Sequence, residues 1–317
     1  MTKAKQHIID DAFRLLAKNT ELSLREYTIF TQCQADIEQS LRQHINRFST
    51  TLYGAFLRKS IVSPLSDNVV DMLIVFSEQD ISNVPPSRVL EKLYETMVQH
   101  YPGTEEIKNQ SAVILPIKDL HYKIRPAYAL SSNTYMVPDK NFDEWSKYDI
   151  NAYSEIFSKE NVAHKNKLLE VIRLVKTWNR FSGNFFNGYF LELLITQVLS
   201  SYEITSYPET LLYIFKAILP KAAVQQHDPA NVEFMIDGLN NMENLITAMR
   251  LIKQSYTLTD EAIAFEQKGE IDKALNNWNK LFPQVFPTQV DMAVGRTRNS
   301  GMKGADALRA LLDQKKA

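Results

Sequence analysis

The sequence predicts an α+β protein in which a small mixed sheet with helical cover is packed on a C-terminal helical lobe. Two observations predict this division. Before residue 150, short runs rich in β-branched residues alternate with helical periodicity, whereas after it nearly every segment repeats its apolar residues at helical spacing. The chain has 317 residues, 44% of them hydrophobic and 23% charged, which is enough for one large domain or two closely packed lobes.

Composition excludes several classes of protein. The net charge of −1 gives no global sign of nucleic-acid binding, although a local basic groove is compatible with a neutral total. The single cysteine, Cys33, excludes a disulfide framework and favours a cytoplasmic setting. The first residues, MTKAKQHIIDDAFRLL, do not read as a signal peptide, and no apolar run approaches the ~20 residues of a membrane span. The histidines show no metal-ligand spacing.

The first 130 residues are expected to run helix, strand, helix, hairpin. Residues 4–48 carry helical apolar spacing, and residues 86–101 predict a further helix. Between them, NVVDMLIVF (residues 68–76) has a period near two around Asp71, which predicts a strand. Residues 111–130 form two apolar runs broken by KDLH, which indicates a β-hairpin with an arm beside that strand.

The second half is expected to be nearly all helical. Residues 161–182 predict one amphipathic helix, followed by helical segments at 189–202 and 241–282. Residues 289–304 hold three of the nine glycines and predict a loop or flexible tail before a short helix at 305–316. The inward face of the amphipathic helix is expected to comprise Leu168, Val171, Ile172, Val175 and Trp178.

Residues 53–76 have the layout of a phosphate- and metal-binding unit. A glycine turn leads into a basic and hydroxyl-bearing segment, a proline turn and the strand with Asp71. This layout resembles the polymerase-β-like nucleotidyltransferase fold, and more specifically the bacterial cGAS/DncV-like nucleotidyltransferases, or CD-NTases, of anti-phage signalling. The signature of that family is Gly-Ser, Thr, a Pro turn, Asp-x-Asp on a strand, and a third Asp in a later Asp-x-x-Pro-Ala phrase. The matching positions here are Gly54, Ala55, Ser60, Pro64, Val69, Asp71, Lys123, Pro126 and Ala127.

The resemblance continues through the helical half and covers about residues 20–287. VIRLVKTWN is similar to the family's Arg-x-x-Lys-x-Trp helix, which supplies Lys176, and NGYFLELL is similar to its Ser-Tyr-x-x-Glu helix, with Gly188 and Tyr189 at the first two positions. The family comparison implies three parts. They are a nucleotidyltransferase-like core with N-terminal helices (1–150), an oligoadenylate-synthase-like helical lobe (151–288) and a flexible C-terminal tail with a short helix (289–317).

Two of the three metal-ligand positions lack a carboxylate. Phosphoryl transfer to a ribose hydroxyl uses two Mg²⁺ ions roughly 4 Å apart, held by carboxylates that share one face of a strand. Val69 has no oxygen ligand, and Lys123 brings a positive charge. We expect an ion pair between Lys123 and Asp71 in place of a metal, attracted by about 4 kcal/mol at an effective dielectric near 20 and opposed by desolvation. Replacement of the missing ligand by Asp67 is the alternative, although the PLSDN context predicts a turn cap; Asp119 is expected in the KDLH turn.

Two of the predicted nucleotide-binding residues lack the hydroxyl that the family pattern has at their positions. The resemblance implies triphosphate contacts from Gly54, Ala55 and Ser60 in the first half, yet Ala55 has no hydroxyl. Gly188 has likewise lost the serine hydroxyl, whereas Lys176 is retained, either as a triphosphate contact or as an exposed lysine. A basic cleft that holds a nucleotide or an acidic partner is a further expectation, with candidate residues Arg58, Lys59, Arg125, Lys176 and Arg180.

These losses predict a pseudo-nucleotidyltransferase. Asp71 is its residual catalytic residue, with Val69 and Lys123 as degenerate positions, no resident metal and no expected cofactor. The resemblance implies a cytoplasmic role in anti-phage defence, with a protein partner from a defence operon, a possible nucleotide ligand and no membrane. Two alternatives stay open. One is an active enzyme with unusual Mg²⁺ ligation that makes a cyclic or linear oligonucleotide, and the other is a nucleic-acid-binding protein.

Overall fold

The computed structural model describes residues 8–107, 112–139, 144–288 and 291–292, and the chain forms two compact units. Each unit contains segments that are distant in the sequence. The helical unit comprises the described residues of 1–21, 157–227 and 235–300. The sheet unit comprises the described residues of 22–156 together with 228–234. None of the helices in the described ranges combines the length and hydropathy needed to cross a membrane.

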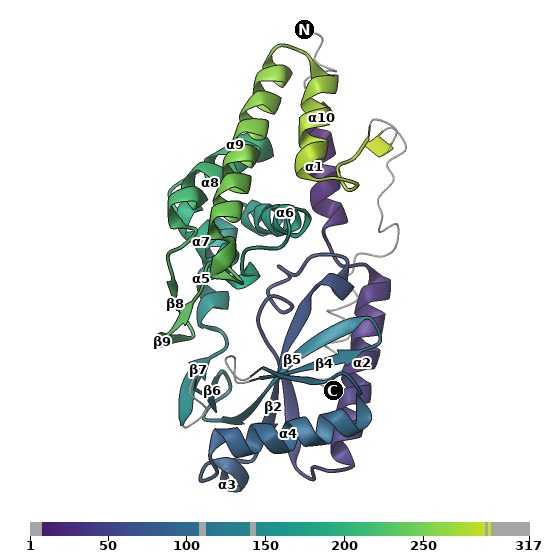
Figure 1. Ribbon diagram of the computed structural model, residues 1–317, viewed down its shortest axis with the longest axis vertical. Coiled ribbons are helices and arrows are strands. Elements are labelled where there is room, and N and C mark those ends of the chain that lie inside the picture. Colours follow the sequence, from purple (N-terminus) through teal and green to yellow (C-terminus); the bar gives the residue numbers. More distant parts are fainter. Residues whose placement is uncertain (1–7, 108–111, 140–143, 289–290, 293–317) are drawn as a thin grey trace. The chain divides into compact units, whose positions relative to one another are not determined.

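The sheet unit is built on a mixed sheet with seven strands in the described residues (Figure 1). The strand order is β1-β2-β5-β4-β3, and β6 and β7 extend from β5; β2 pairs with β5 in parallel, and the other pairs are antiparallel. The strands are β1 (Phe48–Leu52), β2 (Val69–Phe76), β3 (Glu105–Ile107), β4 (Ala112–Ile117), β5 (Leu120–Ala129), β6 (Thr134–Pro138) and β7 (Trp145–Asp149). Its helices are α2 (Leu24–Arg42), η2 (Leu65–Asp67), α3 (Glu78–Ile81) and α4 (Pro86–His100), and the unit boundary at 156/157 falls within α5 (Ala152–Ala163).

The helical unit consists of helices and short connections. The isolated bridge Phe186↔Leu239 and a hydrogen bond from Asn187 N to Gly238 O join the start of α7 to a later loop. The helices are α1 (Ile8–Asn19), α6 (Lys167–Phe181), α7 (Gly188–Leu199), α8 (Tyr207–Ile218), η4 (Leu219–Lys221), η5 (Met242–Asn244), α9 (Leu245–Gln267) and α10 (Ile271–Leu281). A two-stranded ribbon, β8 (Gln226–Asp228) and β9 (Asn231–Ile236), contributes to both units.

The alternation predicted for the central strand is confirmed by burial. Val70, Met72 and Ile74 point to one face of β2 and join the large core under α2 and α4. Leu73 and Val75 point to the other face and pack with Tyr53, Tyr135 and Tyr148. Because side chains alternate along a strand, Asp71 lies on this second face. The hairpin and the helix at 86–101 are confirmed as β4–β5 and α4.

One predicted helix differs from the structure. The expected single helix at 161–182 is broken, because Lys165 and Asn166 have positive φ and separate α5 from α6; its five inward residues are nonetheless buried. The described residues after 150 are nearly all helical, as predicted, apart from the short strands β8 and β9. The predicted tail from 289 lies outside the described residues, apart from 291–292.

The predicted boundary at residue 150 also differs from the observed division. Helix α1 belongs to the helical unit, because its buried face packs against the core of that unit. There Phe13 lies edge-on to Trp278, with ring centroids 4.8 Å apart. Residues 228–234 belong to the sheet unit, where Asn231 Nδ2 donates to Ser146 Oγ at 2.7 Å and Asp149 N donates to Ala230 O at 3.0 Å.

Candidate functional site

Strand β2 carries the positions where a metal site is expected. Val69 opens the strand and is 45% exposed, whereas Asp71 is half-buried on the same face. The intervening side chain points into the opposite core, so these two positions form the i, i+2 pair that an Asp-x-Asp motif would use. A valine in the first of them supplies no oxygen to a cation.

Strand β5 places a lysine beside Asp71. In the parallel register, Asp71 aligns with Lys123 and Leu73 aligns with Arg125, so both cations lie on the Asp71 face of the sheet. The pKa of the Lys123 ammonium is lowered, chiefly by burial and further by Arg125, while the charge of Asp71 opposes the shift. The two side chains therefore act on each other electrostatically; a direct ion pair between them remains a prediction.

Gly54 lies directly against the carboxylate of Asp71. Its φ of +74° is left-handed, and a Cβ at this position would lie 2.6 Å from Asp71 Oδ2. The neighbouring Tyr53 N donates to Asp71 O at 3.2 Å, which fixes the turn on the strand. Only glycine meets both demands, a left-handed backbone and close approach to a side chain. The glycine of the motif thus supports the conformation around Asp71.

The turn after Gly54 is closed by Ser60. Ser60 N donates to Ala55 O at 3.0 Å, and the Ser60 hydroxyl donates to the same carbonyl at 3.3 Å. Ser60 is fully buried, so its hydroxyl serves this backbone contact. Ala55 has no polar side-chain atom. The predicted nucleotide-binding residues of this segment therefore shape the turn around Asp71.

A buried arginine organises the face beside Lys123. Arg125 Nη2 donates to Pro138 O at 3.0 Å, and its guanidinium lies over the ring of Tyr148, 5.5 Å from the centroid. Arg125 also interacts with the Tyr53 hydroxyl, lowering the pKa of a phenol that burial and the charge of Asp71 raise. The cation expected to bind a ligand is thus enclosed by groups of its own unit.

Asp228 is a site residue that sequence reasoning missed. It is 3% exposed, accepts from Tyr148 Oη at 3.2 Å through Oδ2, and accepts from Ala230 N at 2.9 Å through Oδ1. Burial and Asp228 together raise the pKa of Tyr148 well above its usual range. Tyr148 and Asp228 are 80 residues apart, and no motif marks either one. Both of its carboxylate oxygens thus accept hydrogen bonds from protein donors.

Equal numbers of acidic and basic side chains face one another on this side of the sheet. Two carboxylates, Asp71 and Asp228, face two cations, Lys123 and Arg125. Among the described residues no three His, Cys, Asp or Glu side chains gather into a group able to hold a metal ion. Asp119 lies in the β4–β5 turn, as predicted, whereas Asp67 is the last residue of the 3-10 turn before β2 and is not its cap. The donor set therefore fits a two-Mg²⁺ centre poorly.

In the helical unit, Lys176 pairs with the carboxylate of a buried glutamate. Its ammonium forms a salt bridge with Glu192, the glutamate of the Ser-Tyr-x-x-Glu-like segment. Lys176 has a side-chain exposure of 12%, so its interpretation as an exposed helix-surface lysine is wrong. A Cβ at Gly188 would lie 3.6 Å from Lys176 Cε, an ordinary contact, so the helix start has room for the missing serine.

The start of α7 is closed by its own cap. The Asn187 side chain accepts from Tyr189 N at 2.9 Å and from Phe190 N at 3.4 Å, satisfying amides that would otherwise be available to an anion. Tyr189 is half-buried. On α6, Arg173 pairs with Glu21 at 2.9 Å. The motif residues of this unit therefore hold its helices together.

The five cations expected to line one cleft are divided between the units. Arg58 lies over the Tyr153 ring, 4.7 Å from its centroid, in the sheet unit, where Lys59 and Arg125 also belong. Lys176 and Arg180 belong to the helical unit. Their convergence on one ligand remains a prediction.

Comparisons with known proteins agree with this fold. Residues 8–161 match the model of the second messenger oligonucleotide or dinucleotide synthetase domain, SMODS. The chain is 23% identical over 279 residues to a probable cyclic nucleotide synthase of Bacillus cereus, covering 75% of this chain and 82% of that protein. It is 22% identical over 294 residues to a cyclic AMP-AMP-AMP synthase of Acinetobacter, covering 87% of this chain and 84% of that protein.

Solved structures show the same architecture. Escherichia coli CdnC with ATP superposes with a TM-score of 0.65 at 16% identity, over 88% of this chain and 99% of that one. Vibrio cholerae DncV in complex with a linear intermediate superposes with a TM-score of 0.61 at 14% identity, over 77% of this chain and 70% of that one. The fold is that of a polymerase-β-like nucleotidyltransferase. Within this class, the chain resembles the CD-NTases CdnC and DncV in fold, and its residues 8–161 match the SMODS domain.

Proposed function

We propose that this chain is a catalytically inactive CD-NTase and serves as a cytoplasmic regulator, scaffold or nucleotide sensor in bacterial anti-phage defence. The observation that supports this proposal best is the parallel register that sets Lys123, not a carboxylate, beside Asp71. Val69 removes a second ligand from the same face.

The physical argument is one of charge. Two Mg²⁺ ions add four positive charges, which three carboxylates partly neutralise in an active site. Here the corresponding positions carry one carboxylate and one ammonium. A divalent ion placed about 4 Å from a lysine ammonium is repelled by roughly 8 kcal/mol at an effective dielectric near 20. Lys123 therefore disfavours metal binding where Asp71 alone would have to hold it, and we propose that the protein has no resident metal.

The motif residues that are present support a role in binding a partner or a ligand. The helical unit keeps Lys176 and Glu192, which join α6 to α7, and the sheet unit keeps its turn around Asp71. A related protein, Escherichia coli CdnC, has been solved in complex with a HORMA protein. We propose a protein partner for this chain too, with a nucleotide as an additional ligand.

The main alternative is an active nucleotidyltransferase with unusual metal ligation. Two observations support it: Asp71 is present, and the curated relatives carry the names of synthases. Binding of nucleic acid is the remaining alternative, and it predicts an affinity for labelled duplex that falls steeply with salt.

A product assay separates the inactive and active readings. The protein is incubated with four labelled NTPs and either Mg²⁺ or Mn²⁺, alongside the Acinetobacter cyclic AMP-AMP-AMP synthase as a positive control. We expect no cyclic or linear oligonucleotide from this chain. Product that disappears in Asp71→Ala would overturn the proposal. Product that survives that substitution would point to a contaminating enzyme and leave the expected result in place.

A further inference from the structure

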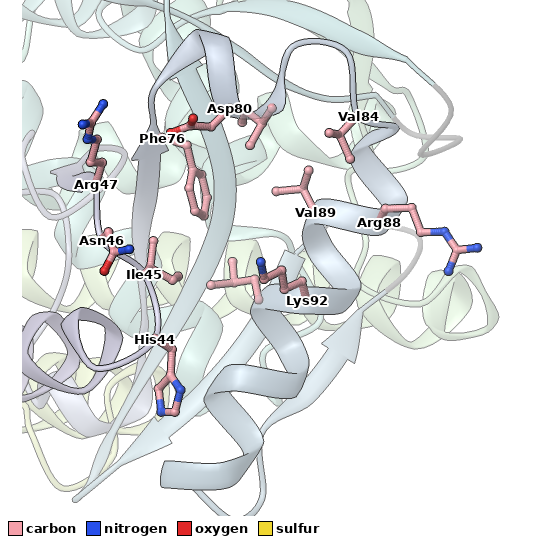
Figure 2. Close-up of a pocket in the computed structure, with 12 residues that line it drawn as sticks. His44, Ile45, Asn46, Arg47, Phe76, Asp80, Val84, Arg88, Val89 and Lys92 are labelled. Carbon is pink, nitrogen blue, oxygen red and sulfur yellow. The ribbon is translucent and has the colours of Figure 1, made fainter.

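A pocket of about 540 Å³ lies in the sheet unit, away from Asp71. It is bounded by the α2–β1 connection, the end of β2, α3 and α4 (Figure 2). Phe76, which lines it, is the last residue of β2, five positions beyond Asp71. At about 3.3 Å per residue, the two positions are separated by roughly 16 Å. The pocket is therefore distinct from the degenerate metal site.

The floor of the pocket is apolar. Its volume lies within the range of small-molecule sites, roughly 300–1,000 Å³, which are lined mainly by hydrophobic side chains with a few polar groups. Ile81, Val89 and Leu93 are buried, so the floor is continuous with the core under α3 and α4. The apolar lining comprises Ile45, Phe76, Ile81, Val84, Val89 and Leu93.

The rim of the pocket is positively charged. Arg47, Arg88 and Lys92 provide three cations against the single carboxylate of Asp80. Arg88 is paired with Glu91 at 3.0 Å, and Figure 2 shows its guanidinium pointing away from the pocket. Lys92 extends in the opposite direction, towards Ile45. Within the described residues, Lys92 forms no ion pair, so its ammonium remains available to an anionic ligand, whereas Figure 2 shows the Arg47 guanidinium pointing away from Phe76 and Lys92.

A histidine pair holds one wall of the pocket. His44 Nε2 lies 2.8 Å from His100 Nε2, a hydrogen bond that joins the end of α4 to the α2–β1 connection. This wall is therefore tied to the helix that carries Lys92.

We propose that this pocket binds a small amphipathic anion, with an aromatic or branched apolar body on the floor and one carboxylate, phosphate or sulfonate group near Lys92. An apolar floor alone would accept a neutral compound, and a charged rim alone would accept a hydrated ion. Their combination selects a molecule that has both parts. The proposal does not depend on whether the chain catalyses nucleotide transfer.

Two related probes separate the apolar and ionic contributions. 8-Anilinonaphthalene-1-sulfonate has an aromatic body with one sulfonate, and N-phenyl-1-naphthylamine has the same rings without the charge. Fluorescence titrations of the full chain are expected to give one saturable sulfonate site, with affinity about tenfold higher than for the neutral probe. Equal affinity for the two probes would overturn the proposed role of the rim.

Substitutions assign the site. Lys92→Gln should weaken sulfonate binding about five- to tenfold, Lys92→Arg should retain it, and Val84→Trp should fill the cavity and abolish it. Lys253→Gln, at an exposed lysine of α9, is the matched control and should have no effect. Thermal melts show whether Val84→Trp folds, and the exposed Lys92 variants keep the test valid if it does not.

Methyl NMR locates the probe directly. The Ile45 and Ile81 methyl signals should shift with added sulfonate, whereas those of Ile214 and Ile252 in the helical unit should not. Shifts confined to the helical unit, or sulfonate affinity unchanged in Lys92→Gln, would contradict the proposal.

Discussion

The two units match the CD-NTase pattern to different extents. In the sheet unit, the positions that would bind metal carry Val69 and Lys123, so the ligand set itself is replaced. In the helical unit, Lys176 and Glu192 are retained as a salt bridge, and one hydroxyl is missing at Gly188. The motif residues that make structural contacts match the CD-NTase pattern, whereas two of the three expected metal-ligand positions do not.

Gly54 supports this distinction within the sheet unit itself. It is part of the motif but lies in a left-handed turn against Asp71, where no other residue fits without strain. Gly54 thus matches the motif at a position with a structural role, whereas the expected metal-ligand positions Val69 and Lys123 do not match it. Substitutions at both kinds of position test whether the comparison holds.

The largest effect is expected from breaking the buried pair of the helical unit. Glu192→Gln leaves the Lys176 ammonium buried without its partner, because Glu192 is fully buried. Loss of one partner of a buried ion pair costs about 3–5 kcal/mol. The free energy of unfolding, measured by urea denaturation, should fall by that amount. The double variant Lys176→Met/Glu192→Leu should recover most of it, and a Glu192→Gln protein of unchanged stability would show that the pair is not structural.

A smaller effect is expected at the turn of the sheet unit. Gly54→Ala should lower the free energy of unfolding by about 2 kcal/mol, because the left-handed backbone disfavours a side chain and the new Cβ meets Asp71 Oδ2. Gly188→Ala is the matched control. Its Cβ makes only ordinary contacts, so it should be neutral or stabilise by about 0.5 kcal/mol. Thermal melts of the two variants give the comparison, and equal losses in both would contradict the special role of Gly54.

The smallest effect concerns the charge of Lys123. The folded protein lowers the pKa of this lysine below its usual 10.5, so in the window between the two values the unfolded chain binds more protons. Stability contributed by this group therefore rises with pH through that window. The unfolding free energy of the unaltered protein should increase relative to Lys123→Met as the pH rises towards 10.5. A difference that stays constant over this range would show that folding does not lower the pKa of Lys123.

The sequence predicted the elements whose pattern is local. Strand β2, helix α4 and the β4–β5 hairpin were predicted because their periodicity and turn residues lie within short segments. The break before α6 was missed because Lys165 and Asn166, which turn the chain there, do not interrupt the helical pattern. The hairpin arm with Lys123 was expected beside the strand with Asp71, and the register aligns the two residues, whereas an ion pair between them remains a prediction.

The surroundings of the site were less predictable. Asp228 comes from β8 and contacts Tyr148 across 80 residues of sequence, so no local signal marks it. Lys176 was expected as a triphosphate contact or as an exposed lysine, and its pairing with Glu192 depends on how α6 packs against α7. Side-chain partners of this kind follow from tertiary packing, which a single sequence does not specify.

The central claim is that Lys123 and Val69 have removed the metal site, and Mn²⁺ binding followed by electron paramagnetic resonance tests it most directly. The unaltered protein and Asp71→Ala should leave the same free Mn²⁺ signal, and Val69→Asp/Lys123→Asp should reduce that signal by binding the ion. Micromolar Mn²⁺ binding by the unaltered protein that is lost in Asp71→Ala would contradict the account.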